Sequence, residues 1–105
     1  MLDIEKDIFR DIIREFPKVG LSYDGFERQH QFITSATLRN YANGKTSPSE
    51  KRYRYVLNCL KQDHNLMFRI MVSNIEQNRG KNIEDMIKDS LYDANKDGIA
   101  IYKVL

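Results

Sequence analysis

The sequence of 105 residues contains one cysteine, Cys59, and no apolar run near the roughly 20 residues that cross a bilayer. A single cysteine excludes an intramolecular disulfide framework. The N-terminal segment is charged throughout and lacks the apolar stretch of a secretory signal peptide. By elimination, these absences predict a cytoplasmic protein that does not contact a membrane.

Patterns of catalysis and metal binding are missing as well. His30 and His64 are isolated in the sequence, and Cys59 lies between apolar residues of an expected helix, where a core thiol is typical. Residues 93–99 match the first half of a calcium loop, but Val104 stands where the loop needs a glutamate. No nucleophile elbow or phosphate-binding glycine loop is present. We expect a protein that is not an enzyme and holds no cofactor or metal.

The composition is that of a globular protein, with 41% hydrophobic and 30% charged residues and no internal repeat. A chain of this length buries one modest core, so association with a second copy would stabilise it. The net charge is only +2, but residues 34–61 hold a single acidic residue, Glu50. The same stretch holds six basic residues: Arg39, Lys45, Lys51, Arg52, Arg54 and Lys61. A basic middle between acidic ends is typical of a polyanion-binding segment, although a solvated helix face would look the same.

Hydrophobic periodicity predicts an all-α fold, a small helical bundle. The expected helices cover residues 2–16, 23–30, 34–41, 48–61, 65–78 and 82–94, and a short terminal β-strand covers 99–105. The core-facing residues of the first, third and fourth helices recur at three- and four-residue spacing: Ile4, Ile8, Phe9, Ile12, Ile13, Phe16, Leu38, Tyr41, Tyr53, Val56, Leu57 and Leu60. The helix at 65–78 is too apolar for one stripe and is expected to be covered on more than one side.

Capping residues predict where the central helices begin and end. Thr34 is expected to cap the third helix, and Asn43-Gly44 to end it in a left-handed conformation. The fourth helix has a start signal in which Ser47 caps, Pro48 takes the first helical position and Glu50 the third.

The stretch from Ile33 to Ser49 carries a family pattern. In this pattern an aliphatic residue and a Ser/Thr cap open a helix, and a second aliphatic residue points inward four positions after the cap. The helix ends in Asn-Gly-Lys, and Pro-Ser begins the next helix. The residues at these places are Ile33, Thr34, Leu38, Tyr41, Asn43, Gly44, Lys45, Pro48 and Ser49. Over residues 21–60 the chain resembles the helix-turn-helix family of phage repressors and Cro proteins, the Xre-type regulators.

This resemblance implies a sequence-specific, repressor-like transcriptional regulator of bacterial or phage origin that binds double-stranded DNA. Residues 1–62 would form the DNA-binding domain, and residues 63–105 a helical extension packed on it or dimerising. The expected base-reading residues are Ser35, Ala36, Thr37, Arg39 and Asn40. The expected phosphate contacts are Thr34, Lys45, Thr46, Lys51, Arg52 and Arg54, together with free backbone N–H groups at the helix start.

The chain departs from the family pattern in the second helix and the turn. Arg28 and Phe32 stand where the family has a small residue and a glycine, and a one-residue insertion in the turn would return Phe26 to the core. Tyr23 or Asp24 stands where the family often has a glutamine that contacts DNA.

Two further questions stay open at the level of sequence. The apolar C-terminal residues are either a homodimer interface or intramolecular core: Met67, Ile70, Met71, Ile75, Ile99 and Ile101. The alternative function is a protein-interaction module on the same scaffold, which binds and inhibits a host or partner protein. Such a module has no need of the basic cluster.

Overall fold

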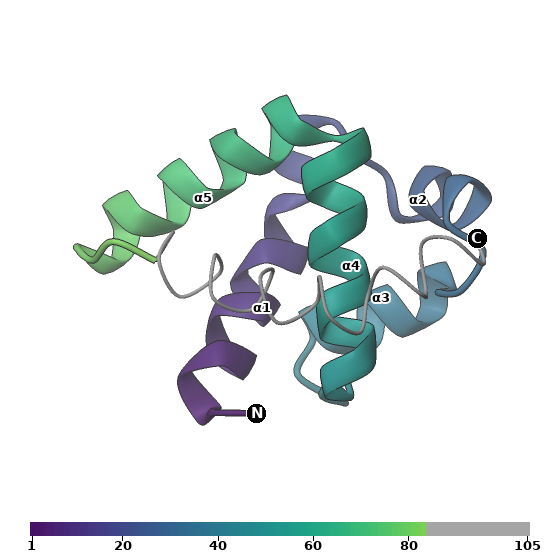
Figure 1. Cartoon of the computed structure of the whole chain (residues 1–105), viewed down its shortest axis with the longest axis horizontal. Coiled ribbons are helices and arrows are strands. Elements are labelled where there is room, and N and C mark those ends of the chain that lie inside the picture. The colour runs from purple at the N-terminus through teal and green to yellow at the C-terminus, as the bar shows by residue number, and fades with distance from the viewer. Residues whose placement is uncertain (84–105) are drawn as a thin grey trace.

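The computed structural model of the chain describes residues 1–83. In this range it is all-helical, with five α-helices, one 3-10 helix and no strand (Figure 1). The elements are α1 (Asp3–Glu15), η1 (Pro17–Val19), α2 (Tyr23–Gln29), α3 (Ser35–Ala42), α4 (Glu50–Asp63) and α5 (Asn65–Arg79). The all-α fold is thus confirmed for these residues. The expected sixth helix, the terminal strand and residues Ile99 and Ile101 lie outside the described range.

Helix α1 supplies the centre of the core. Its apolar residues repeat at helical spacing, and Ile12 and Ile13 are fully buried. The Phe9 ring meets Tyr41 of α3 and Tyr53 of α4 edge to face, with centroids 5.5 and 5.4 Å apart. Edge-to-face aromatic pairs add specific attraction to the hydrophobic burial. One side chain therefore fixes three helices relative to one another.

Helix α2 is short and is held by its aromatic residues. Phe26 is fully buried and packs on Phe16 with ring centroids 5.2 Å apart. The hydroxyl of Tyr23 donates a 2.8 Å hydrogen bond to the Ile13 carbonyl in α1. Arg28 and Phe32 are exposed, and five residues connect α2 to α3.

The ends of α3 agree with the capping prediction. The Thr34 hydroxyl accepts from the Thr37 N–H at 3.1 Å, and Gly44 adopts φ +73° just after the helix. The predicted start of α4 was wrong by two residues, because Ser49, not Ser47, caps it by accepting from the Arg52 N–H at 3.2 Å. Pro48 is buried in the segment before the cap, which leaves Ser49 at the capping position.

Helix α5 packs against α1 and α4 through Phe68, Met71, Val72 and Ile75. The opposite face is open, since Leu66 is 70% and Ile70 44% exposed. Helix α5 therefore contacts more than one element, as predicted, while Leu66 and Ile70 stay exposed. No helix within residues 1–83 combines the length and apolarity needed to cross a membrane.

Candidate nucleic-acid interface

The outer face of α3 is small and polar. Leu38 and Tyr41 point into the core, as expected from their spacing. Ala36, Asn40 and Asn43 follow one another at four- and three-residue steps and so share the opposite face. Ala36 and Asn43 are exposed and Asn40 is partly exposed. The Asn40 side chain makes no hydrogen bond to another residue of the described chain, so its amide remains available to a ligand.

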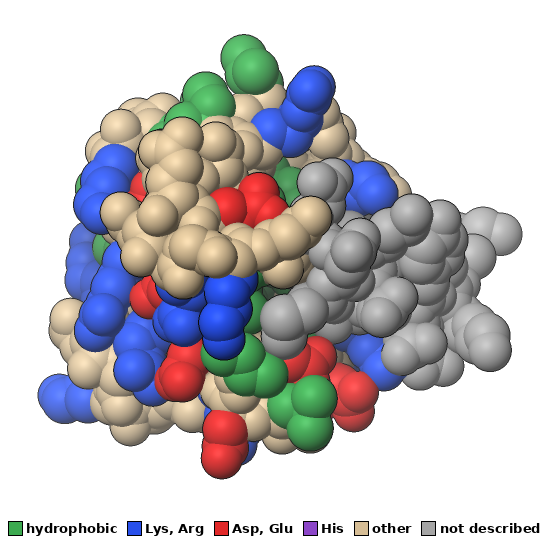
Figure 2. Space-filling view, turned by 90° about the vertical axis from the view of Figure 1, so that its left-hand side faces the viewer, with side chains coloured by type: hydrophobic (Ala, Val, Ile, Leu, Met, Phe, Trp, Pro, Cys, Tyr) green, Lys and Arg blue, Asp and Glu red, His purple; other side chains and the backbone are tan. Residues whose placement is uncertain are grey.

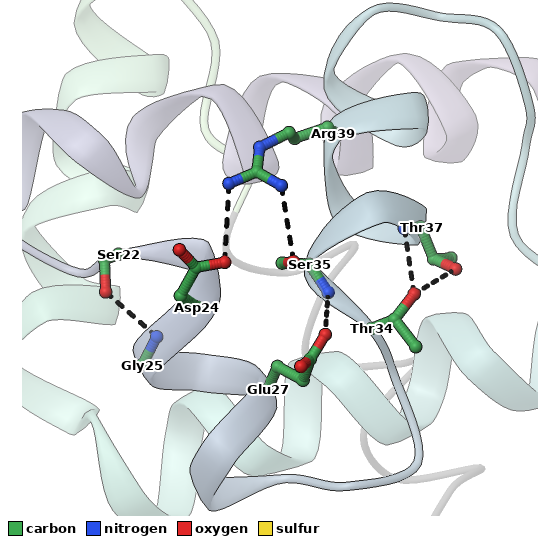
Figure 3. Close-up of polar contacts among 8 residues, drawn as sticks. All are labelled: Ser22, Asp24, Gly25, Glu27, Thr34, Ser35, Thr37 and Arg39. Carbon is green, nitrogen blue, oxygen red and sulfur yellow. Dashed lines mark hydrogen bonds and ion pairs between the residues drawn. The ribbon is translucent and has the colours of Figure 1, made fainter.

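The N-terminal end of α3 is occupied by side chains of the protein itself (Figure 3). Besides the Thr34 cap on Thr37, the Glu27 carboxylate of α2 accepts from the Ser35 N–H at 2.6 Å. A carboxylate at a helix N-terminus is favourable because it faces the positive end of the helix dipole. The expectation that free N–H groups at this end face phosphates is thus corrected for Ser35 and Thr37.

Arg39 is folded toward α2 rather than extended into solvent (Figure 3). One terminal nitrogen donates to the Ser35 hydroxyl at 3.3 Å, and the other to the Asp24 carboxylate at 3.4 Å. The guanidinium carbon also lies 5.9 Å from the centre of the Tyr23 ring. Arg39 remains more than half exposed, so these contacts orient it without burying it.

Apart from Thr34, which caps α3, the expected phosphate-contacting residues divide into two groups. Lys45, Thr46, Lys51 and Arg52 are exposed in the loop after α3 and the first turn of α4. Arg54 is only 17% exposed and forms an ion pair with Glu50 at 2.8 Å. The loop and the first turn of α4 therefore present their cations to solvent, whereas Arg54 is engaged within its own helix.

Two arginines of α1 join this region although the sequence analysis did not select them. Arg14 donates to the Ala42 carbonyl at 2.7 Å, and a Cβ at Gly44 would lie 3.5 Å from the Arg10 side chain. Both therefore lie at the C-terminal end of α3, near Lys45, where the helix dipole favours cations. The sequence offers one weak signal for this position, the i, i+4 spacing of the two arginines on the polar side of α1. The contacts themselves join residues 28 or more positions apart.

Charges are mixed on the side of the molecule where α5 ends. Figure 2 shows Lys and Arg side chains interspersed with Asp and Glu there. Arg79 of α5 pairs with Asp11 of α1 at 2.7 Å, and Lys18 pairs with Glu15 at 2.8 Å. Arg79 and Lys18 are therefore balanced by neighbouring carboxylates, whereas no ion pair joins Lys45, Lys51 or Arg52 to another described residue.

The two histidines, which looked isolated in the sequence, are in contact. His30 follows α2 and His64 lies between α4 and α5, and their Nε2 atoms are 3.1 Å apart. Asp63 lies 3.8 Å from His30, whose ring packs on Phe26 at 4.4 Å. Burial lowers the pKa of both histidines, and the neighbouring His64 lowers that of His30 further. Residues 1–83 contain no group of three or more side chains that could hold a metal ion.

Comparison of the chain with protein-family models, curated proteins and solved structures finds no match. The assignment of a function consequently rests on the residues of α2, α3 and the loop that follows.

Proposed function

We propose that the chain is a sequence-specific, repressor-like DNA-binding regulator in which α2 and α3 form a helix-turn-helix and α3 enters the major groove. One observation carries the proposal. The outward face of α3 is built of Ala36, Asn40 and Asn43, and exposed cations begin immediately after the helix at Lys45. Small polar side chains allow a helix to approach base edges closely, and flanking cations hold the phosphates on either side.

Within this arrangement, base reading and anchoring fall to different residues. Asn40 is suited to a bidentate contact with adenine, and the Ala36 methyl to contact with a thymine methyl. Lys45, Lys51 and Arg52 bind phosphates, which supply affinity and orientation without sequence choice. Binding of an operator would block or recruit polymerase. A pair of copies on an inverted repeat supplies the base contacts that one short helix lacks.

The proposal is tested by gel-shift titration of the full chain with duplex DNA at two salt concentrations. DNA binding through phosphates predicts that log Kd changes linearly with log salt, with a slope of roughly 0.9 per phosphate contacted. Absence of a complex at low salt would refute the proposal.

A pair of substitutions separates the two roles. Asn40→Ala should reduce the discrimination between a selected duplex and a scrambled one, because the adenine contact is lost. Arg52→Ala should weaken binding to both duplexes about equally and lower the salt slope by about one unit. Gln62→Ala, at an exposed position in the last turn of α4, is the control and should change neither quantity. Identical effects of Asn40→Ala and Arg52→Ala would contradict the assignment of roles.

A second candidate function has support from one observation, the exposed Leu66 and Ile70 of α5. Lying one helical turn apart, they offer adjacent apolar surface that a protein partner would bury. In this case the chain would bind and inhibit a partner protein, and the cations after α3 would have no role. The low-salt gel shift distinguishes the two, because only the DNA-binding regulator forms a complex.

A further inference from the structure

The contacts of Arg39 with α2 point beyond general DNA binding to a determinant of sequence choice. We infer that Asp24 is a positioning residue that presets the Arg39 guanidinium to read a guanine beside α3. This inference rests on the proposed function. It concerns Asp24, an exposed residue in the first turn of α2.

The geometry leaves part of the guanidinium free. Its two terminal nitrogens face Asp24 and Ser35, at 3.4 and 3.3 Å (Figure 3). A guanidinium has five N–H donors. Two of them bond to Asp24 and Ser35, and the other three can still donate to a ligand. The edge formed by Nε and one terminal nitrogen presents two parallel donors, which match the O6 and N7 acceptors of guanine.

Positioning matters because a free arginine side chain has many rotamers. Three contacts from one side, with Asp24, Ser35 and the Tyr23 ring, restrict Arg39 before any DNA arrives. A side chain that is already ordered loses less conformational entropy on binding. The Asp24 carboxylate also holds the arginine away from phosphates, because phosphate oxygens would otherwise accept from the same Arg39 N–H groups. When DNA excludes water, the attraction between Asp24 and Arg39 increases.

Glu27 supports the same arrangement from one turn further along α2. Its carboxylate binds the Ser35 N–H at 2.6 Å, and the Ser35 hydroxyl in turn accepts from Arg39. The two carboxylates of α2 therefore fix both the start of α3 and the arginine above it. Negative charges beside a DNA-binding helix also repel phosphates, which lowers affinity for unrelated sequences and so increases specificity.

The experiment uses the full chain. Selection from random duplexes first gives the preferred site. Kd is then measured for that site, for duplexes with each other base at one position in turn, and for a random duplex. The variants are Asp24→Asn, Asp24→Glu, Arg39→Ala and the double variant Asp24→Asn/Arg39→Ala. The control is Glu50→Gln, which removes an exposed carboxylate paired with another arginine, Arg54. Circular dichroism checks that each variant is folded.

We expect Arg39→Ala to abolish a preference for guanine at one position. Asp24→Asn should lower the same preference by about threefold to tenfold while affinity for the random duplex stays equal or rises. Asp24→Glu should restore part of it, and the double variant should equal Arg39→Ala. Glu50→Gln should alter all duplexes alike.

The inference is overturned if Asp24→Asn changes all duplexes by the same factor, as Glu50→Gln does, because Asp24 would then act only through its charge. It is also overturned if Arg39→Ala leaves every base preference intact. In both cases the wild-type protein still discriminates, so the proposed function survives. Failure of the wild-type protein to bind any duplex at low salt overturns both.

Discussion

Helices α3 and α5 have the same relation to the core but opposite outer faces. Each buries one apolar stripe, Leu38 and Tyr41 in α3 and Met71 and Ile75 in α5. Outside, α3 presents small polar residues, whereas α5 presents Leu66 at 70% exposure. The buried stripes explain why both helices form. Only the outer faces distinguish a surface suited to nucleic acid from one suited to a protein.

The ion pairs that hold the two helices differ in the same sense. Arg79 of α5 donates through two nitrogens to Asp11, at 2.8 and 2.7 Å, and both side chains are 29% exposed. Arg39 of α3 meets Asp24 at 3.4 Å, and these side chains are 53% and 63% exposed. Short contacts with restricted access to water stabilise a fold, while long exposed ones are screened. The pair at α5 is therefore structural, and the pair at α3 orients a side chain.

The largest expected effect tests what the two helices share. Leu38→Ala in α3 and Met71→Ala in α5 should each lower the free energy of unfolding by about 2–5 kcal/mol, because both side chains are fully buried and leave cavities. Urea denaturation followed by circular dichroism measures it. Lys51→Ala, at an exposed position of α4, is the control and should change stability by less than about 0.5 kcal/mol. A cost below 1 kcal/mol for one helix alone would show that its core contact is dispensable.

A smaller effect should separate the two ion pairs. In double-mutant cycles with alanine, we expect a coupling energy of about 1 kcal/mol or more for Asp11 and Arg79, because the pair is short and partly shielded. For Asp24 and Arg39 we expect a coupling energy of about 0.2–1 kcal/mol, since both are exposed. The free energy of unfolding of each single and double variant gives these values. Equal coupling at both places would remove the distinction between a structural and an orienting pair.

Much of α3 and of the core could be predicted because its signals are local. Thr34 determines the cap, Leu38 the inward face and Gly44 the end of the helix, and each acts on residues within about one turn of itself. The start of α4 shows the limit of such signals. Pro48 and Glu50 locally favour Ser47 as the cap, yet in the folded chain Pro48 is buried before the helix and Ser49 caps it.

The polar contacts between helices could not be predicted in this way. Glu27 with Ser35, Asp24 with Arg39 and Arg14 with Ala42 depend on how α1, α2 and α3 cross, which no periodicity records. The contact of His30 with His64 joins residues 34 positions apart and was missed for the same reason. Sequence patterns thus predicted helix α3 itself, but not the contacts that orient its side chains.

A weaker effect is expected of pH on the free energy of unfolding, through the contact between His30, which follows α2, and His64, which precedes α5. Burial lowers the folded-state pKa of His30 and His64 below the ordinary value of 6.5, and His64 contributes to the shift of His30 while Asp63 opposes it. The unfolded chain therefore binds more protons between the folded pKa and 6.5. Stability should be fully present above pH 6.5 and decrease as pH falls below it.

Urea denaturation at pH 7.5 and pH 5.5 measures this dependence. The double variant His30→Gln/His64→Gln should lose less stability between the two pH values than the wild-type protein does. An equal loss in both proteins would mean that groups other than the two histidines titrate in this window.

The smallest effect on stability, and the one that completes the contrast with α3, is expected on the outer face of α5. Leu66→Ser/Ile70→Ser should change the free energy of unfolding of the monomer by less than about 0.5 kcal/mol, because neither side chain belongs to the core. If two copies pair through this face, sedimentation equilibrium should give the mass of two chains for the wild-type protein and of one for the variant. The variant should then bind an inverted repeat more weakly but a single half-site as tightly as before. A wild-type protein that sediments as one chain at all concentrations would show that this face does not join two copies.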